Sequence, residues 1–180
     1  MKELSLHILD LAQNSIQANA KLISISIIEN TATDQLTITI TDNGKGMSES
    51  TINKILDPFF TTKNKKTGLG IPLLKQHAEL TSGDIIINSK SGKGTTVKAF
   101  FTHSHVDRQP LGDIAGTLMG LIRSYPELDF EYYHKINEKS FSFTTNEIKK
   151  ELDEIPLSSP EVIKFIKEML KENLEEIMIK

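Results

Sequence analysis

The sequence predicts an α+β fold in which amphipathic helices pack on a β-sheet. Two observations predict it. The first is that segments with strict apolar–polar alternation, which is typical of half-buried strands, come in pairs. The second is that between these pairs apolar residues recur every three or four positions, as in helices. The chain has 180 residues, of which 38% are hydrophobic. This length and composition suit one domain with a real core, or one domain with a smaller appended one.

Composition and charge narrow the class of protein. The chain contains no cysteine, which excludes a disulfide framework and a cysteine-ligated zinc or iron–sulfur site. The first ten residues include charged side chains and no long apolar run, so we expect no signal peptide, no membrane span and a cytoplasmic protein. A net charge of −3 with mixed signs gives no reason to expect nucleic acid as the main partner.

The first expected element is an amphipathic helix from residue 4 to about residue 18. One side is apolar, and polar side chains follow the other side at spacings of three, four and three: His7, Asp10, Asn14 and Gln17. Such a stripe is usually a solvated face, although solvated faces mostly carry Lys and Glu. Asp10 and Asn14 could instead hold a divalent cation through oxygen and position a water molecule.

Two strands are expected next, over residues 22–28 and 36–41, where isoleucine alternates with serine or threonine. A polar turn separates them, so they should be antiparallel neighbours. The second strand ends in Asp42, followed by Gly44 and Gly46. A carboxylate there can accept a hydrogen bond from an exocyclic amine, and the glycines let a flat ring lie against the backbone. The alternative is a plain turn or a calcium loop, although calcium needs more acidic ligands than this segment offers.

A short helix, about residues 48–55, leads into an aromatic and lysine-containing segment that ends in a Gly-x-Gly turn. The segment reads Leu-Asp-Pro-Phe-Phe-Thr-Thr-Lys over residues 56–63, and the turn is Gly-Leu-Gly at residues 68–70. The next helix, about residues 71–80, would present unpaired first-turn N–H groups and the positive end of its dipole to an anion. We therefore interpret the segment as a lid over phosphate groups, with an ordinary glycine-rich turn and solvated lysines as the alternative.

A hairpin of residues 84–88 and 95–101 is expected next, and after about residue 106 a different pattern begins. Thr95 and Thr96, at the start of the second strand, could face a ligand. The later elements are a helix over 114–122, a hairpin of 130–135 and 140–144, and helices over about 145–152 and 159–177. We therefore divide the chain into residues 1–105 and an α+β C-terminal extension, residues 106–180. The extension is either a layer packed on the first part or a surface for a partner.

Five short motifs in a fixed order carry a resemblance to a known family. They are Asp10-x-x-x-Asn14, Asp42-x-Gly44-x-Gly46, Pro58-Phe59-Phe60-Thr61-Thr62-Lys63, Gly68-Leu69-Gly70 and Gly92-x-Gly94-Thr95. They resemble the N, G1, F, G2 and G3 boxes of the GHKL ATPases, the superfamily of DNA gyrase, histidine kinases, mismatch-repair ATPases and a heat-shock chaperone. The F and G2 boxes are most similar to those of sensor histidine kinases. The resemblance, over residues 4–102, implies a Bergerat fold: a two-layer α/β sandwich whose mixed sheet is covered by helices on one face.

The resemblance also implies that the chain binds ATP with Mg²⁺, and it assigns the contacts by position. Asn14 would coordinate the magnesium, Asp42 would bond the adenine amino group, and Thr95 would support adenine recognition through water. The full set of nucleotide contacts that it implies is Asn14, Asp42, Gly44, Gly46, Met47, Phe60, Lys63, Gly68, Leu69, Gly70 and Thr95. Asp10 stands where many members have a general-base glutamate. It would be catalytic together with Asn14, either directly or, because it is one methylene shorter, through a water molecule.

Two functions of different classes fit these residues. Sensor kinases carry a phosphoacceptor histidine on a helical hairpin ahead of this domain, whereas only nine residues precede Asp10 here. We therefore expect a stand-alone ATP-binding domain that acts on a separate protein as a histidine-kinase-like or anti-sigma-factor-like kinase or ATPase. The alternative is a conformational switch that binds ATP, or hydrolyses it slowly, and regulates a partner without transferring phosphate to it.

Overall fold

The computed structural model describes residues 2–56 and 70–179. In these ranges the elements are, in chain order, α1 (Leu4–Gln17), β1 (Leu22–Asn30), β2 (Gln35–Asp42), α2 (Glu49–Leu56), α3 (Gly70–Leu80), β3 (Asp84–Lys90), β4 (Gly94–Thr102), α4 (Ile114–Ser124), β5 (Asp129–Ile136), β6 (Lys139–Thr144), α5 (Thr145–Leu152) and α6 (Pro160–Met178). Each predicted helix and strand is present, with ends within two residues of the predicted ones.

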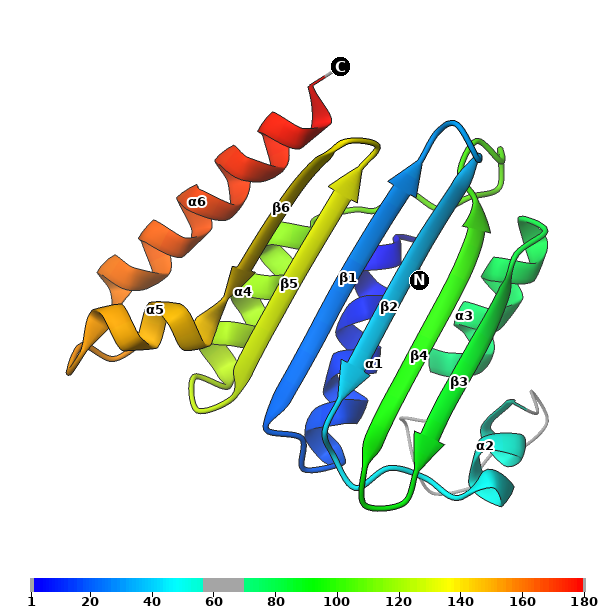
Figure 1. The fold of residues 1–180 in the computed structure, drawn as a ribbon, viewed down its shortest axis with the longest axis horizontal. Helices are drawn as coiled ribbons and strands as arrows, with labels where there is room; N and C mark the ends of the chain where they lie inside the picture. The colour runs from blue at the N-terminus through cyan, green and yellow to red at the C-terminus, as the bar shows by residue number, and fades with distance from the viewer. Residues whose placement is uncertain (1, 57–69, 180) are drawn as a thin grey trace.

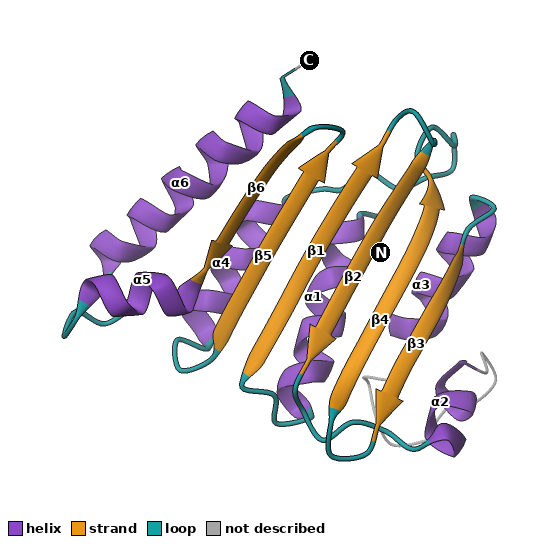
Figure 2. Cartoon of the chain, in the orientation of Figure 1, coloured by secondary structure: helices purple, strands orange, loops and turns teal. Residues whose placement is uncertain are grey.

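The strands form one mixed sheet in the order β3-β4-β2-β1-β5-β6. Neighbouring strands are antiparallel except β1 and β5, which run parallel with Leu22 opposite Asp129. Helices α1, α3 and α4 lie behind the sheet in Figure 1, and the face toward the viewer is open over its central strands. Figure 2 shows the same division into a helical layer and a strand layer. The predicted α+β sandwich, with helices covering one face of a mixed sheet, is therefore confirmed.

The alternation of β1 explains how the two layers hold together. Ile23, Ile25 and Ile27 point between the layers and are at most 1% exposed, whereas Ser24 and Ser26 are half-buried on the open face. Successive side chains of a strand point to opposite faces, so this sequence buries one face and leaves the other to water. Each buried isoleucine stabilises the fold by about 1.5–3 kcal/mol relative to an exposed one.

Replacing Ile25 by alanine is expected to lower the free energy of unfolding by about 2–5 kcal/mol, because the change leaves a cavity between the two layers. Ser26→Ala, on the open face of the same strand, is the matched control, with an expected change within about 0.5 kcal/mol. Urea unfolding of the three proteins measures both values. Equal midpoints for the two variants would contradict this packing.

The C-terminal extension continues the sheet of the first part, a pairing that the sequence did not predict. Strand β5 adds to β1 along its whole length, and a buried polar network reinforces this junction. The Glu29 carboxylate accepts hydrogen bonds from Nε2–H of His103, at 2.8 Å, and of His134, at 2.9 Å. His134 is fully buried, and its Nδ1 accepts from the Tyr132 hydroxyl at 2.8 Å. The division of the chain after residue 105 stays a prediction.

Candidate nucleotide site

A cavity of about 280 Å³ opens between α1, the end of β2 and the start of α3. The predicted site residues that line it are Asn14, Asp42, Gly46, Met47, Gly70 and Thr95. Leu11, Ile40 and Val97 supply apolar wall between these polar groups. A concave, mostly apolar wall with a few converging polar groups is the usual form of a small-molecule site, and it suits a flat ring that carries polar edges.

Asp42 is held in one orientation by two hydrogen bonds. Its Oδ1 accepts the N–H of Gly44 at 2.8 Å, and its Oδ2 accepts the hydroxyl of Ser15 at 2.7 Å. A carboxylate has about four lone-pair sites, so further acceptor capacity remains for a ligand. Ser15 was missed in the sequence, although one signal was present. It follows Leu11 by four positions and so falls on the apolar side of α1, where a serine needs a buried partner.

The loop after β2 is fixed against the β3–β4 hairpin. Gly46 has φ +65°, and a Cβ there would lie 2.0 Å from the carbonyl oxygen of Lys90, so only glycine fits. Ser89 was also missed by sequence reasoning. Its Oγ accepts the N–H of Met47 at 2.8 Å and lies 2.8 Å from the Thr95 hydroxyl. This serine therefore joins two predicted contact residues that come from different segments.

Asp10 packs against the first residue of α3 rather than lining the cavity itself. A Cβ added at Gly70 would lie 1.6 Å from Asp10 Oδ2, so the two helices approach as closely here as glycine permits. Oδ2 is buried and has no hydrogen-bond partner among the described residues. Burial raises the pKa of the Asp10 carboxyl group above its usual range, because water no longer stabilises the charged form.

The remaining predicted contacts divide into two groups. Gly44 does not line the cavity but supports it, because its N–H fixes Asp42. Phe60, Lys63, Gly68 and Leu69 lie outside the described residues. The lid therefore stays a prediction, whereas the walls of the cavity on the α1, β2 and β4 side are defined.

His7 belongs to the same polar stripe of α1 as Asp10 and Asn14, but the structure buries it outside the cavity. It is 1% exposed and packs edge-on against His77 of α3, with ring centroids 5.2 Å apart. Its Nε2 lies 3.1 Å from Oε1 of Gln109, in the segment after β4. Burial, and then the neighbouring His77, lower the pKa of the His7 imidazole to about 4, so the ring is neutral at neutral pH.

Acidification below pH 6.5 is therefore expected to destabilise the protein through His7. The pKa of His7 is about 4 in the folded state and 6.5 in its unperturbed form, so the unfolded chain binds the proton first as the pH falls. The His7 contribution to the free energy of unfolding should decline between pH 6.5 and pH 4, by up to about 3 kcal/mol, and this contribution alone levels off below pH 4. Urea titrations at several pH values measure this slope, and His7→Gln should flatten it.

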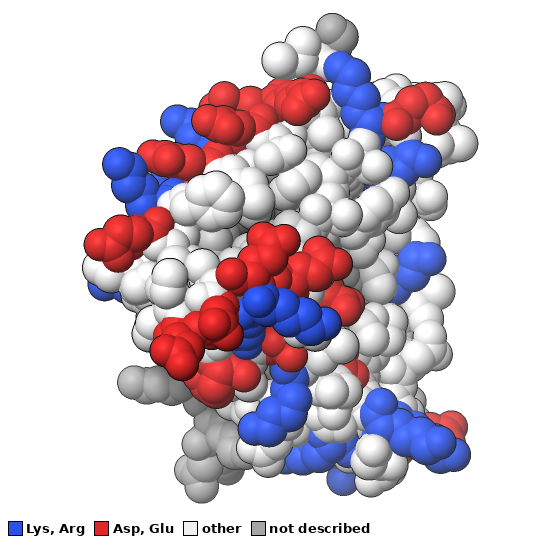
Figure 3. Space-filling model, turned by 60° about the vertical axis from the view of Figure 1, so that its left-hand side comes forward, with Lys and Arg blue, Asp and Glu red and all other residues white. Residues whose placement is uncertain are grey.

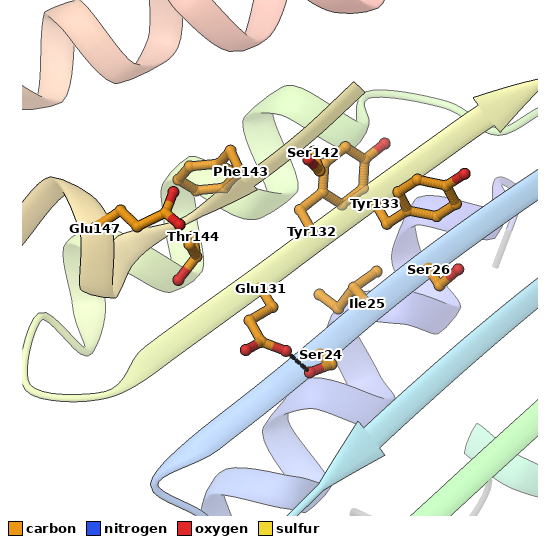
Figure 4. A pocket seen from close by; sticks show the side chains of 10 residues that line it. All are labelled: Ser24, Ile25, Ser26, Glu131, Tyr132, Tyr133, Ser142, Phe143, Thr144 and Glu147. Carbon is orange, nitrogen blue, oxygen red and sulfur yellow. Dashed lines mark hydrogen bonds between the residues drawn. The ribbon is translucent and has the colours of Figure 1, made fainter. Parts of the chain in front are cut away.

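A second groove lies on the open face of the sheet and contains none of the predicted site residues. Figure 4 shows its lining side chains, which come from β1, β5, β6 and the start of α5. Glu131 accepts a hydrogen bond from the Ser24 hydroxyl within it. On the side seen in Figure 3, acidic side chains gather in an upper and a lower group, with Lys and Arg among and beside them. The groove is separate from the cavity at Asp42.

None of the helices in the described part of the chain combines the length and the apolar character that crossing a membrane requires. The fold and the cavity together define an α+β domain with a candidate small-molecule site. Residues 2–105 match the family described as histidine kinase-, DNA gyrase B- and HSP90-like ATPases. The chain belongs to this ATPase family, as the order of its motifs predicted.

Two of the similar curated proteins are bacterial sensor histidine kinases. The sensor histidine kinase ZraS of Escherichia coli (strain K12) is 32% identical over 105 residues, which cover 58% of this chain and 23% of that protein. The sensor histidine kinase YvrG of Bacillus subtilis (strain 168) is 31% identical over 97 residues, 51% of this chain and 17% of that protein. The chain therefore spans less than a quarter of the length of these relatives.

A solved structure supports the fold over a longer range. The N-terminal domain of a DNA repair protein superimposes with a TM-score of 0.55, covering 80% of this chain and 52% of that one at 18% sequence identity. At this identity the likeness shows the fold alone. The shared fold extends beyond the residues that match the ATPase family, so it takes in part of the C-terminal extension.

Proposed function

We propose that the cavity binds the adenine base of ATP and that Asp42 selects it. The observation that carries this proposal is the orientation of Asp42. Its carboxylate is already held by Ser15 and Gly44 and lies beside apolar wall, as a receptor for an exocyclic amine would be. The N–H bonds of that amine would meet an ionised acceptor, which makes stronger hydrogen bonds than a neutral one.

The phosphates would extend from the cavity to the start of α3. Gly70, the first residue of this helix, lines the cavity, so unpaired N–H groups and the positive end of the helix dipole lie at its wall. Lys63, Gly68 and Leu69 would close over the phosphates as a lid. A phosphate site of this kind needs no Walker lysine, because the helix end and the lid supply the donors.

Magnesium would bind between Asn14 and the phosphates. Asn14 lines the cavity, and Asp10 on the same helix presents a buried oxygen without a partner among the described residues, so the available donors are the oxygens that Mg²⁺ prefers. No group of three His, Asp or Glu that could hold a metal exists in residues 2–56 and 70–179. Phosphate oxygens and water would therefore complete the coordination, and the bound ion would offset the phosphate charge.

Asp10 would act on the attacking group. Its raised pKa suits a carboxylate that takes a proton from a water molecule or an acceptor side chain, directly or through one water. In that step the bond between the γ-phosphorus and the β–γ bridging oxygen breaks, a bond to the attacking atom forms, and ADP leaves. The protein contributes mainly by positioning and charge stabilisation.

The acceptor would be a separate protein, in a kinase reaction of the histidine-kinase-like or anti-sigma-factor-like type. The support is the similarity to proteins named as sensor histidine kinases, over the ATPase part alone. A second candidate is a switch that binds or slowly hydrolyses ATP and regulates a partner. One observation favours it: β5 of the C-terminal extension is hydrogen-bonded to β1 of the ATPase part, so the two parts can respond together.

The test follows labelled phosphate. The purified chain is incubated with γ-labelled ATP and Mg²⁺, alone and with an extract of the cells that contain it, and label is followed into free phosphate and protein. Label on a protein band with the wild-type chain, lost with Asp10→Ala and Asn14→Ala, is the kinase outcome. Label only in free phosphate, or ATP bound without turnover, favours the switch. Absence of ATP binding would refute both.

A further inference from the structure

Gln109 forms a bridge between two helices of the nucleotide site, although it lies outside residues 2–105, which match the ATPase family. Its side-chain Oε1 lies 3.1 Å from Nε2 of His7 on α1, and its Nε2 lies 3.2 Å from Nε2 of His77 on α3. Residue 109 follows the last residue that matches the family, so this contact belongs to the C-terminal part of the chain. One amide therefore joins α1, α3 and the segment that leads to α4.

The chemistry of the amide fixes the direction of both hydrogen bonds. The amide oxygen only accepts, so His7 donates from Nε2–H, and the amide nitrogen only donates, so His77 accepts at Nε2. The bridge forms with both imidazoles neutral, and burial lowers the pKa of each ring, which keeps them so. The two rings also contact each other edge-on. The bridge thus links the Nε2 atoms of a buried and a half-buried histidine on two packed helices.

The segment around Gln109 is itself anchored to α1. The N–H groups of Leu4 and Ser5, which have no partner inside the helix, donate to the carbonyl oxygens of Pro110 at 2.9 Å and Leu111 at 2.8 Å. On the other side, Nη1 of Arg108 donates to the Gln109 carbonyl oxygen at 3.0 Å. Gln109 is therefore held on a backbone that caps α1, which is the helix that carries Asp10 and Asn14.

Helix α3 connects the bridge at His77 to the proposed phosphate site at Gly70. His77 lies in its last turn and Gly70 is its first residue, so the helix touches α1 at both ends. A short helix moves as a rod, and fixing its last turn fixes where its N-terminus points. At that N-terminus the approach to Asp10 leaves no spare room, since even a methyl group on Gly70 would clash.

We propose that Gln109 is a positioning residue of the nucleotide site. By bridging His7 and His77 it sets the place of the α3 N-terminus relative to Asn14 and Asp10. The inference rests on the proposed function, because the α3 N-terminus matters only if it receives phosphate. It predicts that losing the bridge weakens recognition of the phosphates and leaves recognition of the adenosine part unchanged, because Asp42 has no contact with this bridge.

The test compares ATP with adenosine. Gln109→Met keeps the length of the side chain and removes both hydrogen bonds, and it is expected to raise the Kd for ATP about three- to tenfold with the Kd for adenosine unchanged. Gln109→Glu is the rescue variant. Its carboxylate accepts from His7, and from His77 once that ring carries its proton on Nε2, so ATP affinity should return to within about twofold. Gln76→Met, at an exposed position of α3, is the matched control.

A double-mutant cycle tests whether Gln109 affects ATP binding through His77. If Gln109 acts through His77, then Gln109→Met added to His77→Ala should raise the Kd for ATP no further than the larger single change. Additive losses, or an unchanged Kd for ATP in Gln109→Met despite a lower melting temperature, would overturn the inference and leave a purely structural residue. Failure of the wild-type chain to bind ATP is a different result, because it removes the proposed function itself.

Discussion

Replacing Asp42 by asparagine is expected to weaken adenine-nucleotide binding at least about a hundredfold while the fold stays intact. The replacement keeps an oxygen that can accept from the Gly44 N–H, and its amide nitrogen can donate to the Ser15 hydroxyl oxygen, so both present contacts survive in reoriented form. What is lost is the ionised acceptor for the adenine amine. The affected group is buried, so the mismatch is not relieved by water.

Calorimetric titration with ATP and with ADP measures the effect, and circular dichroism together with the melting temperature checks the fold. Asp107→Asn, at an exposed position away from the cavity, is the control and should bind as the wild type does. A folded Asp42→Asn variant with unaltered affinity would remove the cavity from its proposed role. Parallel loss in the control would instead point to a general effect of net charge.

The helices and strands could be predicted because the pattern of neighbouring residues in the sequence indicates each of them. In β1 the alternation of Ile23, Ile25 and Ile27 with serines specifies both the strand and its buried face. Gly46 was predicted to let a flat ring lie against the backbone, which stays a prediction, and the structure gives a second reason for glycine there, its close approach to the Lys90 carbonyl oxygen. Periodicity and glycine position are local signals, so they can be interpreted without knowledge of the fold.

The long-range contacts could not be predicted in this way. The alternation of β5 fits any neighbour equally well, so nothing local indicated its parallel pairing with β1. His7 has the spacing of a ligand-facing residue, but Gln109, more than a hundred positions later, covers it. Ser15 and Ser89 act by hydrogen-bonding to Asp42 and Thr95 across the fold, and a lone serine gives no sign of its partner.

Replacing Gly70 by alanine is expected to slow ATP turnover about a hundredfold and to weaken ATP binding, and the cause is steric. Its Cβ would lie 1.6 Å from Oδ2 and 2.7 Å from Cγ of Asp10, so either the carboxylate or the start of α3 must move. If the carboxylate moves, the proposed base is misplaced. If the helix moves, its N-terminus withdraws from the phosphates. A displacement of about 1 Å in a catalytic geometry is enough to cost about a hundredfold in rate.

Two further variants separate this clash from the ordinary effects of the substitution. Gly120→Ala, in α4, meets no atom within 4 Å and is expected to stabilise the protein by about 0.5–1 kcal/mol, because alanine is the better helix former. Adding Asp10→Ala to Gly70→Ala removes the clashing carboxylate, so the double variant should regain ATP affinity and melting temperature but not turnover. Turnover is measured as phosphate release from ATP with Mg²⁺. Recovery of turnover in the double variant would exclude Asp10 from the chemistry. A Gly70→Ala protein as active as the wild type would instead contradict the close packing of α3 against α1 at Asp10.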